Sequence, residues 1–136
     1  MTLILVTGSR LWNDDLYIWR VLDEWLAKCQ GELFELVHGA CPTGADKIAD
    51  MWAYARLKQG KQVSVSRFPA QWVGADGNVD RRAGFRRNAE MVTAVKLAGG
   101  GHCVAFIRAR SSGATHCANL AAKEGIPTIR HRWEER

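Results

Sequence analysis

Residues 3–10, Leu-Ile-Leu-Val-Thr-Gly-Ser-Arg, change abruptly from apolar to small polar side chains and end in a positive charge. The apolar run is typical of a buried β-strand. The turn after it either only redirects the chain at the surface or holds an anion such as a phosphate. In the second case Gly8 lets the backbone approach the ligand, and Thr7 and Ser9 offer hydroxyl groups. Arg10 adds a planar fork of donors that matches a phosphate.

Outward from this stretch, strand-like and helix-like segments alternate along the whole chain. Each amphipathic helical segment ends near a glycine, and Asp14 or Asp15 is a good N-cap for the first one. Alternation of this kind is typical of βαβ units. We therefore expect one domain over residues 1–136 with a Rossmann-like three-layer α/β/α sandwich and a mostly parallel sheet of about five strands. The expected strands are residues 3–6, 33–38, 63–68, 103–107 and 127–130.

Composition narrows the class of protein. The 136 residues are 47% hydrophobic and 24% charged, as in an ordinary globular domain. No apolar run approaches the roughly 18 residues that cross a bilayer, and the start lacks a signal-peptide pattern, so we expect a cytoplasmic protein without membrane contact. The four cysteines are scattered, and His38 with Cys41 supplies too few ligands for a metal site, so we expect none. A net charge of +5 favours anionic partners, from nucleotides to nucleic acid.

Three expected strand ends carry unusual residues: 7–10 (TGSR), 38–46 (HGACPTGAD) and 108–116 (RARSSGATH). In an open parallel sheet the carboxyl ends of the strands share one edge, and ligands bind there at the point where the strand order reverses. We therefore expect these three segments to meet. The first lacks the full dinucleotide fingerprint and the P-loop pattern, so neither of these is indicated.

The second and third segments each lead into an expected helix. Thr43 can cap the second helix with Asp46 three residues later, and the turn formed by Pro42 and Gly44 leaves N–H groups open to an anion. Asp46 either only complements the helix dipole or contacts a ligand, and His38 is either a structural strand-end residue or a ligand contact. The third helix start repeats the pattern, with Ser111 or Ser112 as the cap. Arg108 and Arg110 flank it.

The segment at residues 81–91 (RRAGFRRNAEM) is the densest basic cluster. Such a run is usually a solvated face, but its arginines can also face the site. Asn88 falls among the expected core positions Phe85, Met91 and Val92, so it either ties two loops together or reaches a ligand. Trp12 and Trp72 fall in loops near the site edge, where a flat ring can stack on a base. We expect three other tryptophans, Trp19, Trp25 and Trp52, in the core.

Taken together, these residues resemble the SLOG superfamily, named for the Smf/DprA and LOG proteins, and within it the small single-domain YspA-like branch of actinobacteria and their phages. The shared motifs are VTGSR-x-W, HGACPTGAD-x-IAD-x-WA, PA-x-W, RN-x-x-MV and AFI-x-x-x-SSGAT, in order along nearly the whole chain. The resemblance implies a Rossmann-like fold that binds a nucleotide-derived ligand, and some relatives sense such signals. The LOG branch instead cleaves the N-glycosidic bond of nucleoside monophosphates with an Arg and a Glu. Arg87 matches the Arg, but the loop SSGATHCANL lacks the Glu.

The leading expectation is a sensor or binding protein for a nucleoside phosphate, NAD or ADP-ribose class ligand, with no cofactor required. The alternatives are a phosphoribohydrolase with Asp46 and Arg87 as catalytic residues, and a nucleic-acid-binding protein that uses the arginine cluster. A homodimer or larger homo-oligomer is expected from the exposed edges of a small sheet and from the LOG resemblance. The expected ligand-binding residues are Thr7, Gly8, Ser9, Arg10, Trp12, His38, Gly39, Gly44, Ala45, Asp46, Arg87, Asn88, Ser112, Gly113, Ala114 and Thr115.

Overall fold

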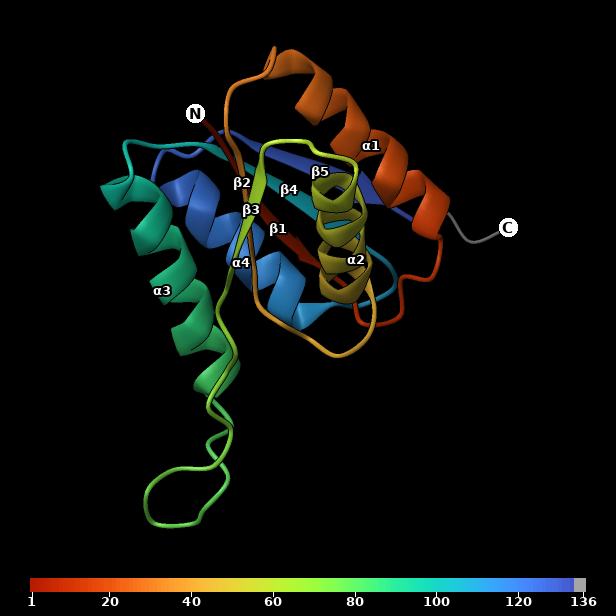
Figure 1. The fold of residues 1–136 in the computed structure, drawn as a ribbon. Helices are drawn as coiled ribbons and strands as arrows, with labels where there is room; N and C mark the ends of the chain where they lie inside the picture. Colours follow the sequence, from red (N-terminus) through yellow and green to blue (C-terminus); the bar gives the residue numbers. More distant parts are fainter. Residues whose placement is uncertain (134–136) are drawn as a thin grey trace.

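The computed structural model describes residues 1–133, which form a five-stranded parallel sheet between two layers of helices (Figure 1). The strands are β1 (Thr2–Gly8), β2 (Phe34–His38), β3 (Val63–Arg67), β4 (His102–Ile107) and β5 (Thr128–Arg132). The helices are α1 (Asp15–Lys28), α2 (Ala45–Lys58), α3 (Ala83–Leu97) and α4 (Ser112–Lys123). The predicted Rossmann-like α/β fold is confirmed, and every strand pair is parallel.

The strand order β3-β2-β1-β4-β5 places the first strand in the middle of the sheet. The chain first builds outward from β1 through β2 to β3, then crosses over to β4 and builds outward to β5. The direction of winding therefore reverses between β1 and β4. This is the position at which open α/β sheets bind ligands.

The two faces of β1 belong to different cores, because successive side chains of a strand point to opposite sides. Ile4 and Val6 pack with residues of α1 and α2 on one face. Leu3 and Leu5 pack with residues of α3 and α4 on the other. Burial on both faces explains why residues 3–6 are continuously apolar. It also fixes the position of the turn that follows β1.

The helix starts agree with the sequence in one case and not in another. The Asp14 side chain caps α1 by accepting a 3.1 Å hydrogen bond from the Tyr17 N–H, as predicted. The predicted cap at Thr43 is wrong: the N-cap of α2 is Gly44, and no side chain caps the helix. Gly44 has a φ of +79°, and a Cβ there would collide with the Ser9 and Arg10 backbone. Close contact with the turn after β1 thus decides where α2 begins.

Between β3 and α3 the chain forms a projecting hairpin, residues 72–80, which we call the arm (Figure 1). Val73 and Val79 form an antiparallel bridge, and the Asp80 N–H donates a 2.6 Å hydrogen bond to the Trp72 carbonyl oxygen. These two contacts give the arm a defined shape. Its root lies beside the carboxyl edge of the sheet.

Within residues 1–133, no helix combines the length and the apolar character that a membrane crossing needs. The same residues contain no group of three or more His, Cys, Asp or Glu side chains placed to hold a metal ion. All four cysteines are free thiols; Cys29, Cys103 and Cys117 are buried in the core, and Cys41 is half-buried.

Candidate functional site

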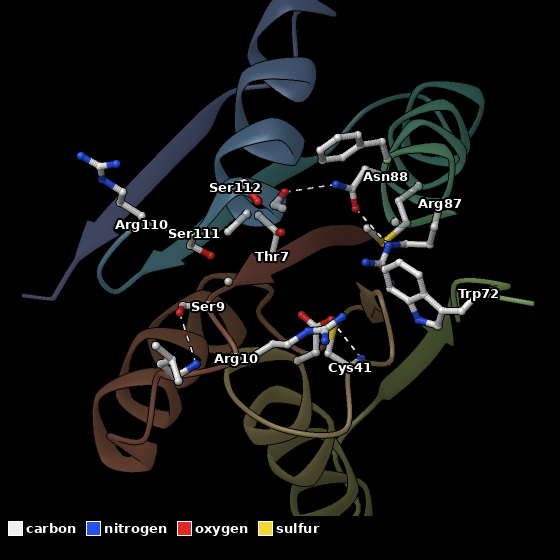
Figure 2. Close-up of a pocket in the computed structure, with 18 of the residues that line it drawn as sticks. Thr7, Ser9, Arg10, Cys41, Trp72, Arg87, Asn88, Arg110, Ser111 and Ser112 are labelled. Atoms are coloured by element: carbon white, nitrogen blue, oxygen red, sulfur yellow. Dashed lines mark hydrogen bonds between the residues drawn. The ribbon is translucent and has the colours of Figure 1, made fainter. Parts of the chain in front are cut away.

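A pocket of about 350 Å³ lies at the carboxyl edge of the sheet, at the ends of the neighbouring strands β1 and β4 (Figure 2). Its walls come from the turn after β1, the β4–α4 turn, the first half of α3 and the root of the arm. Two of the three predicted strand ends therefore line the pocket broadly, and the segment after β2 contributes Cys41 and Asp46. The lining residues are Thr7, Gly8, Ser9, Arg10, Leu11, Cys41, Asp46, Trp72, Arg81, Gly84, Phe85, Arg87, Asn88, Met91, Arg110, Ser111, Ser112, Gly113 and Ala114.

The turn after β1 is held rigidly by backbone hydrogen bonds around Ser9. The Ser9 N–H donates to the Phe106 carbonyl oxygen at 2.8 Å, and the Ser9 carbonyl oxygen accepts from the Ala45 and Trp12 N–H groups, each at 3.2 Å. Gly8 is needed for packing, because a Cβ there would collide with Ala45 and with the Phe106 carbonyl oxygen. Arg10, in contrast, is exposed at this turn.

Arg10 extends across the pocket from the end of β1 towards the arm (Figure 2). Its Cζ atom lies 5.7 Å from the centre of a ring of Trp72, which is a cation–π distance. The described residues give Arg10 no carboxylate within ion-pair distance. Its positive charge therefore stays available to an anion that enters the pocket.

Arg87 supplies a second positive charge, from inside the wall of the pocket. The side chain is only 9% exposed. Its Nη1 donates to the Gly39 and Phe68 carbonyl oxygens, and its Nε donates to Asn88 Oδ1 at 3.0 Å. These acceptors are all neutral oxygens, so they orient the guanidinium without cancelling its charge.

Asn88 joins α3 to the start of α4. Its Nδ2 donates to the Gly113 carbonyl oxygen at 3.1 Å, and its Oδ1 accepts from Arg87. Of the two alternatives that the sequence left open, the structure therefore shows the structural tie, on a side chain that also lines the pocket.

The start of α4 forms the wall opposite Arg10. The first N–H groups of a helix have no partner within the helix. Among the described residues, none accepts a hydrogen bond from the N–H groups of Ser112, Gly113 or Ala114. A Cβ built on Gly113 would meet no atom within 4 Å, so this helix end is open. It is suited to an anionic group.

Asp46 brings a carboxyl group into this basic pocket. The side chain is 5% exposed, and its Oδ2 accepts a 3.2 Å hydrogen bond from the Cys41 N–H. Burial raises the pKa of Asp46, although the nearby His38 and the hydrogen bond from Cys41 act in the opposite direction. Burial also raises the pKa of the neighbouring Cys41 thiol, and the Asp46 charge adds to this shift. The carboxyl is therefore closer to neutrality than a solvated aspartate.

Comparison with known proteins places this geometry in a family. The sequence model described as "YspA, cpYpsA-related SLOG family" matches residues 2–73, which include the first two of the three strand ends. The gene 61 protein of Mycobacterium phage D29 is 39% identical over 129 residues, which are 95% of each chain.

The chain belongs to the YspA, cpYpsA-related SLOG family. The resemblance drawn from its motifs is thus confirmed. Among solved structures, two crystal structures of the C-terminal domain of a Pyrococcus furiosus hydrogenase align with 96% and 95% of this chain and with 91% and 90% of theirs. Their TM-scores are 0.47 and 0.46, at 11% and 12% sequence identity.

One SLOG motif residue, Trp12 of VTGSR-x-W, is not at the pocket. Trp12 is 3% exposed and packs at ring-centre distances of 5.5 Å from Phe106 and 5.1 Å from Trp133. Its indole N–H donates to the Asp14 carbonyl oxygen at 3.1 Å. The expectation that this ring stacks on a ligand is therefore wrong, because the turn after β1 folds Trp12 back into the core.

His38, in the long SLOG motif, is also structural. It is 2% exposed, its Nε2 lies 2.8 Å from Asp50 Oδ1, and its Nδ1 accepts from the Ala40 N–H at 2.9 Å. Both ring nitrogens are therefore occupied within the protein. Burial raises the pKa of Asp50, but hydrogen bonds from Arg67 and His38 outweigh it, so the pKa is below its usual value.

Four other predicted ligand contacts, Gly39, Gly44, Ala45 and Thr115, lie behind the pocket wall or beside it and do not line it. Gly39 leaves room for the Arg87 guanidinium, and Gly44 leaves room for the turn after β1. The Ala45 and Thr115 N–H groups donate to the Ser9 and Ser111 carbonyl oxygens. These residues support the residues that line the pocket, without lining it themselves.

The arginine cluster divides between different environments. Arg87 and Arg81 line the pocket, whereas Arg86 pairs with Asp80 at the root of the arm and Arg82 is exposed. Phe85 was expected in the core, but it is 44% exposed and lines the pocket. Its position three residues before Asn88, on the same side of a helix, was the signal for this role. Arg81 and Arg110 also line the pocket but were absent from the expected ligand-binding residues. The other lining residues absent from that list are Leu11, Cys41, Trp72, Gly84, Phe85, Met91 and Ser111.

Proposed function

We propose that this SLOG protein binds a nucleotide or nucleotide-derived ligand, of the nucleoside phosphate, NAD or ADP-ribose class, and acts as a sensor or binding protein. The supporting observation is the convergence of four arginines on one pocket at the reversal point of the sheet. These are Arg10, Arg81, Arg87 and Arg110. A basic pocket of about 350 Å³ fits a phosphate-bearing small molecule better than a neutral one.

Each part of the pocket has a role in this proposal. The start of α4 provides unpaired N–H groups for a phosphate, and Arg10 provides a side-chain fork from the opposite wall. Arg87 adds a second, fixed charge in the pocket wall, since its own contacts orient it. Asp46, in the floor, is placed to accept hydrogen bonds from ribose hydroxyl groups in its ionised form.

A thermal-shift series tests this function. AMP, ADP, NAD, ADP-ribose and cyclic nucleotides are added to the wild type, to Arg10→Ala and to Arg20→Ala. A ligand present at 100 times its Kd adds about 2.7 kcal/mol to the free energy of unfolding and raises the Tm. Arg20 lies over Tyr17 on α1, outside the pocket, so its variant is a matched control for the loss of one charge.

We expect at least one of these compounds to raise the Tm of the wild type and of Arg20→Ala. The same compound should have a much smaller effect on Arg10→Ala. If no compound raises the Tm of the wild type, the proposal is wrong. Equal Tm shifts in all three proteins would mean that Arg10 does not contact the ligand.

A second candidate, hydrolysis of the N-glycosidic bond of a nucleoside monophosphate, is favoured by the buried Asp46 at the pocket floor. Ionised Asp46 can stabilise positive charge that develops on the ribose, and protonated Asp46 can donate a proton to the departing base. Its raised pKa brings the two forms closer in population at neutral pH than for an ordinary aspartate.

This candidate predicts release of free base from AMP at high protein concentration, measured by chromatography over time. Asp46→Asn keeps an oxygen that can accept from the Cys41 N–H but removes the acid. Release of free base by this variant should therefore fall to background. Absence of free base in the wild-type reaction would leave binding without turnover.

A further inference from the structure

We propose that the indole ring of Trp72, at the root of the arm, is the subsite for the base of the ligand, and that Arg10 covers this ring until a phosphate draws it away. This inference rests on the proposed nucleotide binding and names the part of the pocket that distinguishes a nucleotide from a phosphate alone.

The first observation is an apolar ring left open in a basic pocket. Trp72 is 42% exposed and lines the pocket, whereas Trp12 and Trp52 are 3% and 0% exposed in the core. Exposure of a large flat ring to water is unfavourable, and stacking on the π-face of a base removes that cost. Every nucleotide base has such a face, so the ring selects the chemical class of ligand.

The second observation is that Trp72 is held in position by a hydrogen bond to its main chain and by a contact of its ring with α3. The Trp72 carbonyl oxygen accepts the 2.6 Å hydrogen bond from the Asp80 N–H, which closes the arm. On the other side the ring lies against the first turn of α3, because a Cβ on Gly84 would come within 3.1 Å of Trp72 Cη2. Stacking on a ring that is already positioned costs little conformational entropy.

The third observation is the contact between Arg10 and the ring. The guanidinium lies 5.7 Å from the ring centre and has no carboxylate partner among the described residues. A charge-assisted hydrogen bond to phosphate is stronger than an exposed cation–π contact. Arrival of the phosphate therefore moves Arg10 from the ring to the anion and leaves the ring face free for the base.

Phosphate capture and base stacking are thus coupled through one side chain. A nucleotide uses both parts of the pocket, whereas pyrophosphate uses the arginines and the α4 start without touching Trp72. Purine nucleotides should bind more tightly than pyrimidine nucleotides, because the larger ring system covers more of the indole.

The test measures the affinities of ADP and pyrophosphate by titration calorimetry, for the wild type, Trp72→Ala, Trp72→Phe and Trp19→Ala. We expect Trp72→Ala to weaken ADP binding by about 10-fold or more, the size of a lost base–aromatic stack. Pyrophosphate affinity should stay within about two-fold, since the phosphate contacts remain. Trp72→Phe should restore most of the ADP affinity, because it keeps an aromatic face.

Trp19→Ala is the matched control. Trp19 is also a partly buried tryptophan beneath an arginine, with Arg56 Cζ 5.3 Å from its ring, but it lies between α1 and α2. Both of its affinities should equal those of the wild type. As a second readout, ADP should change the tryptophan emission of the wild type and not that of Trp72→Phe.

The outcomes separate this inference from the function on which it rests. Unchanged ADP affinity in Trp72→Ala overturns the base subsite while leaving nucleotide binding intact. An equal loss of ADP and pyrophosphate affinity also overturns it, because Trp72 would then only support the arginines. If the wild type binds pyrophosphate but not ADP, the base subsite is likewise overturned. If neither compound binds the wild type, the base subsite is overturned for ADP, and the thermal-shift series with the other nucleotides decides whether the proposed function fails as well.

Discussion

Gly39 lies directly against the Arg87 guanidinium, and this contact leaves no room for a side chain. A Cβ at this position would overlap the guanidinium Cζ at 2.6 Å. The buried arginine has little room to retreat, since its other contacts are to Phe68 and Asn88. We predict that Gly39→Ala lowers the free energy of unfolding by about 1–3 kcal/mol, as is usual for overpacking a filled interior. Urea denaturation followed by circular dichroism measures this change.

Gly113→Ala is the matched substitution at an open position. An added Cβ there meets nothing within 4 Å, and the residue lies in the first turn of α4. Alanine is a better helix former than glycine, so this variant should be unchanged or up to about 1 kcal/mol more stable. Equal destabilisation of both variants would contradict the packing argument for Gly39.

The sequence predicted residues of the site where a local signal existed. Gly8, Ser9 and Arg10 were found because they follow a buried strand, and Asn88 because it is a polar residue on an apolar helix face. Arg81 and Arg110 were noted as basic neighbours but not placed among the expected ligand contacts, since their approach to the pocket depends on how the arm and the β4–α4 turn fold in space. Trp12 was misplaced because a tryptophan in a turn has the same sequence signal whether it faces a ligand or the core.

Between elements, Asp23 on α1 holds α2 through two partners at once. It accepts hydrogen bonds from the indole N–H of fully buried Trp52 at 2.8 Å and from Arg56 at 2.8 and 2.9 Å. Asp23→Ala leaves the Trp52 N–H without an acceptor, which costs about 1–3 kcal/mol of stability. Asp23→Asn keeps an acceptor oxygen and should be milder. Chemical denaturation at pH 7 compares the two variants.

The same contact predicts a pH dependence. The Arg56 hydrogen bonds lower the pKa of Asp23 below its ordinary value of 3.8. A carboxyl with a lowered folded-state pKa contributes stability above its unfolded pKa and loses it as the pH falls through the folded pKa. The stability difference between wild type and Asp23→Asn should thus be constant from pH 7 to about 5 and shrink below about pH 4. Glu124→Gln, which breaks the exposed Lys96 pair, should change stability little and serves as the control.

At the same scale, periodicity predicted every strand and helix, while contacts between elements set some of their ends. Asp14 could be recognised as the cap of α1 because its hydrogen bond to Tyr17 is local in sequence. The start of α2 could not, because Gly44 is placed by the Ser9–Arg10 backbone from another part of the chain. The arm has no sequence periodicity, and its Val73–Val79 bridge depends on turn geometry alone.

Across the whole molecule, one of the four cysteine thiols lines the pocket and the other three lie in the core, so their reactivities should differ. Cys41 is half-buried and lines the pocket, whereas Cys29, Cys103 and Cys117 are 4%, 0% and 0% exposed. Burial raises the pKa of Cys117 to about 11. Since the thiolate is the reactive form, the native protein should label with iodoacetamide at Cys41 first, and the buried thiols should react only through unfolding.

The pH dependence of this labelling has a definite sign. Because the pKa of Cys41 is raised, its labelling rate should climb at higher pH than that of a free cysteine. A bound nucleotide should slow labelling at both sites for different reasons. It covers the Cys41 thiol directly, and it slows exposure of Cys117 by stabilising the folded state. Mass spectrometry of digested protein measures each site, with Cys41→Ser as the control for assignment. Labelling of Cys117 as fast as Cys41 without denaturant would mean that α4 separates locally from the sheet at β1. Protection at Cys117 alone would place the ligand outside the pocket.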